Sequence, residues 1–208
     1  MATESIVTTP FRLAFPEVFA PKAAAEGGKE KYSVTLLFPK DGSLLIPSMP
    51  GEGVLALRKL ALAAIKEKWS EDKTKWPPNL RSLDLKTYLS PNGKDGWPVR
   101  DGDLVEWDGF EGQVFVRAAS QFRPGMVNPK LQPIINVEDV FGGLICRAQI
   151  NAYAYDTNGN RGVTFGLNNL QILKDDGTIF GGKQNAANVF DAFGEAGGAA
   201  QSNDDIPW

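Results

Sequence analysis

Two stretches of the chain place arginine, amide and aromatic side chains on one face of what the pattern indicates are β-strands. Side chains of a strand alternate between its two faces, so every second residue shares a face. In residues 145–155 one face is small and apolar, and the opposite face carries Arg147, Gln149, Asn151, Tyr153 and Tyr155. In residues 113–123 a second mixed face carries Phe115, Arg117, Gln121 and Arg123.

This combination of side chains suits single-stranded nucleic acid. Unpaired bases stack on aromatic rings at about 1–3 kcal/mol per base, and arginine neutralises phosphates. Because every base has a π-face, such a surface binds without reading sequence. The same alternation also fits an ordinary solvated sheet face with amphipathic tyrosines, so the pattern alone leaves both interpretations open.

The C-terminal residues are a second candidate binding element. The tip combines two carboxylates with apolar side chains: Asp204, Asp205, Ile206, Pro207 and Trp208. Such a peptide suits a partner pocket with an apolar floor and a basic rim, although chain ends are also often polar and frayed. Residues 184–208 hold four acids and no lysine or arginine. This composition predicts a flexible acidic tail behind a folded domain over residues 1–183.

Composition bounds the class of protein. The 208 residues are 42% hydrophobic, which is enough for one packed domain. The net charge of −3 divides into +1 for residues 1–183 and −4 for residues 184–208. A nearly neutral body can still carry a local basic groove.

The rare residue types argue against catalysis and metal binding. There is no histidine and a single cysteine, Cys146. The commonest general base, the commonest metal ligand and any internal disulfide are therefore missing, so we expect no enzyme activity, metal or cofactor. The apolar runs fall short of membrane-spanning length and the N-terminus lacks a signal-peptide pattern. We therefore expect a soluble, cytoplasmic protein without a membrane partner.

The remaining pattern predicts a mostly β fold with one main helix. Apolar residues recur at helical spacing over residues 54–69, and residues 70–100 indicate a long irregular loop. A turn near residues 156–160 predicts a hairpin between the last two strands. The predicted strands cover residues 11–15, 31–38, 103–107, 113–123, 144–156 and 161–174.

Several segments carry a resemblance to a known family. They are residues 11–15, 31–40, 123–125, 132–134, 147–156 and 162–171, in that order. Together they resemble a family of bacteriophage single-stranded DNA-binding proteins over residues 6–193. The tip is also similar to that of bacterial single-stranded DNA-binding proteins, which end Asp-Asp-Asp-Ile-Pro-Phe, with Trp208 here in place of the Phe.

The resemblance implies both a fold and a function. It implies an OB-fold-like barrel that coats single-stranded DNA during phage replication and recombination in the host cytoplasm. It also implies that the tail recruits replication proteins, such as a polymerase or a helicase/primase, and competes with DNA for the basic groove. The usual OB order is three strands, a helix and two strands. Two strands are predicted here before the helix and four after it, so either residues 11–38 hide a strand or the barrel is elaborated.

Two alternatives from other functional classes remain open. A β-rich virion or carbohydrate-binding module would stack sugars on Trp76, Trp97 and Trp107. A metal-dependent nuclease would hold Mg²⁺ on Asp101 and Asp103, which share a face if 103–107 is a strand, although a polar turn leading into a strand is the favoured explanation of these acids. The residues do not distinguish a monomer from a dimer, or DNA from RNA preference.

Overall fold

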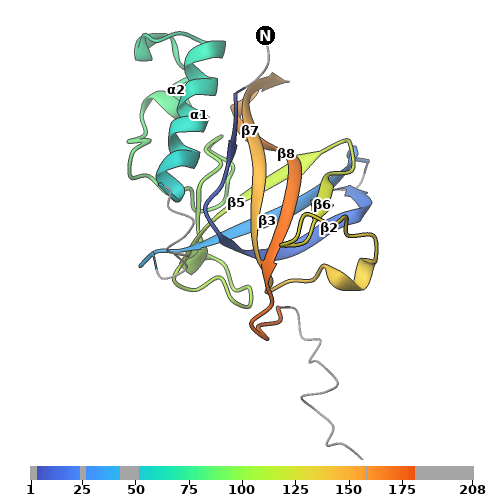
Figure 1. The fold of residues 1–208 in the computed structure, drawn as a ribbon. Helices are drawn as coiled ribbons and strands as arrows, with labels where there is room; N and C mark the ends of the chain where they lie inside the picture. The colour runs from blue at the N-terminus through green and yellow to red at the C-terminus, as the bar shows by residue number, and fades with distance from the viewer. Residues whose placement is uncertain (1–3, 24–26, 43–51, 158, 181–208) are drawn as a thin grey trace, which may run out of the picture.

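The strands form one ring-like sheet (Figure 1). The computed structural model describes residues 4–23, 27–42, 52–157 and 159–180. Strands β2, β3, β5, β8 and β7 pair in that order, and β7 pairs back with β2. The strands of these described residues are β1 (Ser5–Val7), β2 (Phe11–Ala23), β3 (Glu30–Pro39), β4 (Arg100–Asp101), β5 (Gln113–Ser120), β6 (Gly125–Val127), β7 (Ile145–Thr157) and β8 (Asn160–Lys174).

The ring is partly open, because two of its pairings are short. The β2–β7 and β5–β8 pairings each match two residue pairs, whereas β7 and β8 pair along almost their whole length. Only β5–β8 is parallel among the five ring pairings. The predicted mostly β, OB-like fold is confirmed as a ring-like sheet rather than a fully closed barrel. Its interior is apolar and includes Phe11, Leu36, Val116, Ile150 and Phe165.

The order of elements departs from the usual OB pattern by elaboration. Two ring strands precede the main helix and three follow it, while β1, β4 and β6 are additions at the edges. The described residues of 11–38 hold no further strand, because β2 and β3 occupy most of that stretch themselves.

Helix α1 (Val54–Lys68) covers part of the ring by packing on β7 and β8. Its apolar stripe buries Leu57, Leu60, Ala61, Ala64 and Ile65, as the helical spacing predicted. The following residues are largely irregular, also as predicted, and hold only the short helix α2 (Pro78–Arg81) and a 3₁₀ turn at Lys73–Lys75 before β4.

One predicted strand is wrong, and the end of another is misplaced. Residues 103–107 form no strand; a 3₁₀ turn covers Gly102–Leu104, and Gly109 and Gly112 have positive φ angles of 78° and 71° that bend the chain. Strand β5 ends at Ser120, three residues earlier than predicted. The hydroxyl of Ser120 accepts a hydrogen bond from the Phe122 amide at 3.0 Å, which begins a turn there.

The last two strands form the predicted hairpin, with Thr157 paired to Asn160. The predicted boundary at residue 183 and the tail of residues 184–208 lie outside the described residues, so both stay predictions. Among the described residues, no helix is both long and apolar enough to span a membrane.

Candidate nucleic-acid interface

Strand β8 joins the two mixed faces into one continuous outer surface. Ala119 of β5 and Asn151 of β7 both pair with Gly166. Because β5 runs parallel to β8, Arg117 is level with Thr164, which pairs with Tyr153 on the other side. The tertiary structure therefore brings an arginine of one predicted face and a tyrosine of the other onto neighbouring positions around β8.

Arg117 is the most accessible cation of this surface that lies within a strand. Its side chain is exposed, and its Nη2 donates to the hydroxyl of the buried Ser33 on β3 at 3.0 Å. This one bond orients the guanidinium across β3 and leaves further donors for a phosphate.

Gln121 and Arg123 lie in the turn after β5 and do not follow strand alternation. Both are exposed, and the Arg123 guanidinium carbon lies 4.8 Å from the centre of the Phe19 ring on β2. This cation–π contact fixes the Arg123 head group near the end of the β2–β3–β5 surface. Strict alternation with Val116 and Ala118 would turn Phe122 toward the core, but Phe122 is 82% exposed because the strand has already ended.

Arg147 and Gln149 lie in a groove between β7 and β8 that edge strands β1 and β6 border, with a volume of about 270 Å³. The Arg147 Nε donates to Gln171 Oε1 at 2.7 Å. Gln149 accepts from Asn169 at 2.7 Å and donates to Ser5 at 3.2 Å. These side chains therefore already have protein partners, which limits what they offer to a ligand.

The remaining three residues of the β7 face differ in exposure. The Asn151 amide lies against Gly166, where an added Cβ would collide with it. Tyr153 is 40% exposed and offers its ring to solvent. Tyr155 is half-buried across Gly162, and burial together with the charge of Asp95 raises the pKa of its phenol.

Phe115 cannot stack on a base in this structure, which corrects the assignment from alternation. Its side chain is 2% exposed. The Phe110 ring lies edge-on at 5.0 Å between centroids, and the Arg100 guanidinium lies 4.6 Å from the Phe115 ring centre. The bend at residues 102–112 thus covers this part of the outer face, although β5 itself points Phe115 outward.

An aromatic pair that sequence reasoning missed lies above this cluster. Phe15 and Trp107 are 48% and 45% exposed, and their rings meet edge to face with centroids 5.4 Å apart. Arg100 adds a cation 6.0 Å from the Trp107 ring. Exposed rings beside a guanidinium are the combination that binds unpaired bases.

A bulge in β2 turns Phe15 outward. Strict alternation would place Phe15 in the core with Phe11 and Leu13, but the β2–β3 register shifts between Ala14 and Glu17. Phe15 has a φ angle of 46°, a left-handed conformation that is uncommon for a bulky residue. Pro16 was the available signal, because proline inside a strand often marks a bulge.

The aromatic pair is connected to Arg117 through the sheet register. Ala14 pairs with Thr35 on β3, and Thr35 pairs with Arg117 on β5. Phe15 directly follows Ala14, so the outer surface runs from Tyr153 through Arg117 to the Phe15–Trp107 pair. This row, with Arg117 between aromatic groups, is the candidate interface.

The acids proposed for a Mg²⁺ site are already engaged. The Lys40 ammonium donates to Asp101 at 2.5 Å and to Asp103 at 2.6 Å. The hydrogen bond from Lys40, together with one from the Gly112 amide, lowers the pKa of the Asp103 carboxyl. The hydrogen bonds to Asp101 and Asp103 raise the pKa of Lys40. No cluster of three or more metal-ligating side chains occurs within the described part of the chain.

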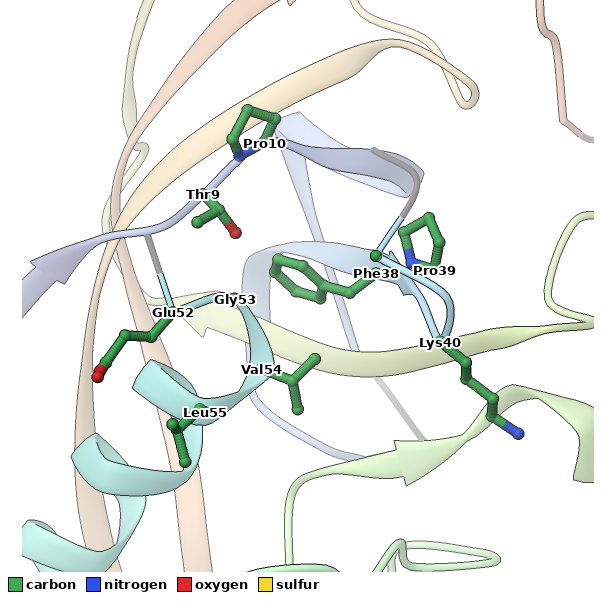
Figure 2. A pocket seen from close by; sticks show the side chains of 10 residues that line it. Thr9, Pro10, Phe38, Pro39, Lys40, Glu52, Gly53, Val54 and Leu55 are labelled. Carbon is green, nitrogen blue, oxygen red and sulfur yellow. The ribbon is translucent and has the colours of Figure 1, made fainter. Parts of the chain in front are cut away.

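Two of the three tryptophans proposed to stack sugars are buried. Trp76 and Trp97 are 7% and 1% exposed, so only Trp107 is open to a ligand. A further cavity of about 320 Å³ lies between the start of α1, the end of β3 and the residues just before β2. Figure 2 shows the charged groups of Lys40 and Glu52 directed away from it, so no charged groups of the described residues converge there.

Comparison with known proteins identifies relatives. The model of one protein family, described as the ssDNA-binding protein of Enterobacter phage Enc34, matches residues 4–205. A putative protein p50 of Acyrthosiphon pisum secondary endosymbiont phage 1 is 29% identical over 182 residues, covering 86% of this chain and 89% of that protein.

Two solved structures share the fold. The single-stranded DNA-binding protein of bacteriophage Enc34 in complex with ssDNA has a TM-score of 0.59 and 21% identity, over 83% of this chain and 87% of that one. The single-stranded DNA-binding protein gp2.5 of bacteriophage T7 has a TM-score of 0.53 and 13% identity, over 84% and 93%.

Proposed function

Since the chain belongs to the family of the Enterobacter phage Enc34 ssDNA-binding protein, we propose that it binds and coats single-stranded DNA without sequence specificity. The observation that carries this proposal is the row of exposed groups running from Tyr153 through Arg117 to Phe15 and Trp107. Binding, rather than catalysis, is the activity in the family's description.

The chemistry of each side chain indicates which part of the DNA it contacts. Bases stack on Tyr153 and on the Phe15–Trp107 pair, while Arg117, Arg123 and Arg147 neutralise phosphates. Arg147, Gln149 and Asn151 line the continuation of the surface and, with Gln121 and Tyr155, supply polar contacts at its edges. Aromatic faces accept any base, so the surface needs no base-specific hydrogen bonds.

The wider role follows from family membership and from the tail composition. We assign the protein to phage DNA replication and recombination in the cytoplasm of the bacterial host. The tail tip, with Asp204, Asp205, Ile206, Pro207 and Trp208, recruits replication proteins such as a polymerase or a helicase/primase. Two carboxylates beside apolar side chains support this role.

Titration of a fluorescent oligo-dT of about 30 nucleotides tests the binding proposal. The intact chain is expected to bind at low salt and to weaken as salt rises, with a log–log slope of about −0.7 per phosphate neutralised. Contacts from Arg117, Arg123 and Arg147 would give a slope of about −2. Absence of binding at low salt, or binding that ignores salt as sugar stacking does, contradicts the proposal.

Replacing the exposed tyrosine tests the β7 end of the surface. Tyr153→Ala is expected to weaken oligo-dT binding by about 1–3 kcal/mol, because one stacking platform is lost. Tyr153→Phe keeps the ring and is expected to retain most of the affinity. Equal affinity for the wild type and a folded Tyr153→Ala protein would show that DNA does not reach this end.

A further inference from the structure

Helix α1 and the irregular loop that follows it enclose an apolar groove. Its volume is about 380 Å³, within the range of roughly 300–1,000 Å³ usual for ligand pockets. Leu55 and Leu62 on α1 form one wall, and Trp76 and Leu85 of the loop form the other. Leu55 remains 49% exposed, so apolar surface is left here for a partner to cover.

Hydrogen bonds fix the two walls of the groove to each other. Arg58 on α1 donates to the carbonyl oxygens of Leu85 at 3.0 Å and Tyr88 at 2.8 Å. The Trp76 indole donates to the Ser70 carbonyl at 2.8 Å. A partner therefore meets a preformed site and does not have to order the loop on binding.

The rim of the groove is basic. Four of the lining residues are cations and one is an acid: Arg58, Lys59, Lys73, Lys86 and Asp84. The Asp84 carboxylate already accepts hydrogen bonds from the Thr87 hydroxyl at 2.7 Å and the Lys86 amide at 3.2 Å. The groove thus fits a partner that combines apolar side chains with carboxylates.

The loop between β6 and β7 presents a segment of this chemistry. Residues 135–139 are all exposed, and they lie between Ile134 and Val140, which pack in the core. Ile135 and Val137 are 77% and 60% exposed. Glu138 and Asp139 follow directly, so two apolar side chains and two carboxylates stand together on the surface.

Backbone hydrogen bonds hold this segment in one shape. The Ile134 amide donates to the Met126 carbonyl at 3.0 Å. The amides of Asp139 and Val140 donate to the carbonyls of Asn136 and Val137, both at 3.3 Å, in the 3₁₀ turn at Val137–Asp139. The segment therefore loses little conformational freedom when it binds.

The groove and the segment lie on opposite sides of the molecule. Figure 1 shows α1 and α2 at the left of the ring, and β6 with the yellow loop after it at the right. We propose that residues 135–139 of one copy dock in the groove of a second copy, with Ile135 and Val137 on the apolar walls and the two carboxylates toward Lys73 and Lys86. Such a head-to-tail contact leaves a free groove at one end and a free segment at the other, so copies add in a row.

This inference rests on the proposed binding of single-stranded DNA. A contact made by about five residues is small and therefore weak between free molecules. Copies that occupy neighbouring positions on one strand meet at an effective concentration of order mM, where a weak contact forms. Neither the groove nor the segment includes Tyr153, Arg117, Phe15 or Trp107, so both copies hold DNA while they touch.

Charge reversal in the full chain tests the contact. The groove variant is Lys73→Glu/Lys86→Glu, and the segment variant is Glu138→Lys/Asp139→Lys. For each protein, the affinity per site is measured on long poly-dT and on an oligo-dT that holds one copy, of about 4–16 nucleotides. We expect the wild type to bind poly-dT about tenfold more tightly than the short oligo-dT, and each variant alone to lose this advantage. The ratio cancels the effect of altered net charge on DNA binding itself.

Mixing the two variants restores the complementary charges. In an equal mixture on poly-dT, reversed segments meet reversed grooves, and native segments meet native grooves. The advantage of about tenfold is expected to return in the mixture. Lys29→Glu/Lys174→Glu changes two exposed lysines outside both surfaces and is the matched control, which keeps the advantage.

Three outcomes would overturn the inference. Equal affinity of the wild type for both DNA lengths would mean that neighbouring copies do not touch. Loss of the advantage in the groove variant alone would mean that another acidic segment occupies the groove. Failure of the mixture to restore the advantage would mean that the two surfaces do not meet. Failure of the wild type to bind even the short oligo-dT would instead contradict the proposed function.

Discussion

Removing both rings of the Phe15–Trp107 pair is expected to weaken binding of oligo-dT by about 2–6 kcal/mol, or roughly 30-fold and more. Each ring that stacks on a base contributes about 1–3 kcal/mol, and a tenfold change in affinity corresponds to about 1.4 kcal/mol. The two rings are 48% and 45% exposed and stand at one end of the row that contains Arg117. The measurement is a titration of Phe15→Gly/Trp107→Ala against the wild type at constant salt.

Phe15→Gly is not expected to destabilise the fold, so the change in DNA affinity reports the loss of the ring. Phe15 has a φ angle of 46°, which glycine adopts without steric cost, so Phe15→Gly removes the ring and relieves backbone strain together. Trp107 also packs on Phe110 at 5.1 Å between ring centres, so thermal unfolding of each variant is followed in parallel.

A matched control uses exposed apolar residues away from the interface. Ile135→Ala/Val137→Ala removes side chains that are 77% and 60% exposed on the loop between β6 and β7. This control is expected to bind an oligo-dT that holds one copy as tightly as the wild type does. If the aromatic double variant is folded and equally tight-binding, the base-stacking role of the pair is wrong.

Neutralising the tip is expected to abolish recruitment of replication proteins without lowering the affinity for DNA. Asp204→Asn/Asp205→Asn/Trp208→Ala removes the charges and the aromatic anchor, and a buried tryptophan hot spot is commonly worth about 2 kcal/mol or more. The measurement is capture of polymerase and helicase/primase from phage-infected host cells by the immobilised protein. Unchanged capture of both would contradict a recruiting tip.

The neighbouring residues of the tail supply the control for this experiment. Gln201→Ala/Ser202→Ala/Asn203→Ala alters the same number of side chains without removing charge or an aromatic ring, so capture is expected to persist.

The elements with a regular local sequence pattern were predicted correctly. On β7 the alternation placed Cys146, Ala148, Ile150, Ala152 and Ala154 inside; the first four are buried, and Ala154 is half-buried against the core. The hairpin to β8 and the helix at Val54–Lys68 also follow from local signals. These elements repeat with a period of 2 or 3.6 along the chain, so a short window contains the information that specifies them.

The candidate interface followed from sequence only in part. Arg117 and Tyr153 are accessible as alternation predicted, but Phe115 is buried because the bend at residues 102–112 folds over it. Gln121 and Arg123 are exposed because β5 has already ended, not because they share a strand face with Arg117. Alternation states which way a side chain points and does not state what covers it.

The sequence by itself determined the class of protein: a mostly β domain with one main helix, mixed arginine and aromatic faces, an acid-rich C-terminal segment and a resemblance to phage single-stranded DNA-binding proteins. Only the tertiary structure decided which rings are exposed, because the bulge at Phe15 and the cover over Phe115 depend on contacts between distant segments. It also decided that Tyr153 and Arg117 flank β8, since this requires both an antiparallel and a parallel register. Exposure and proximity are properties of packing between elements, and periodicity within one element does not encode them.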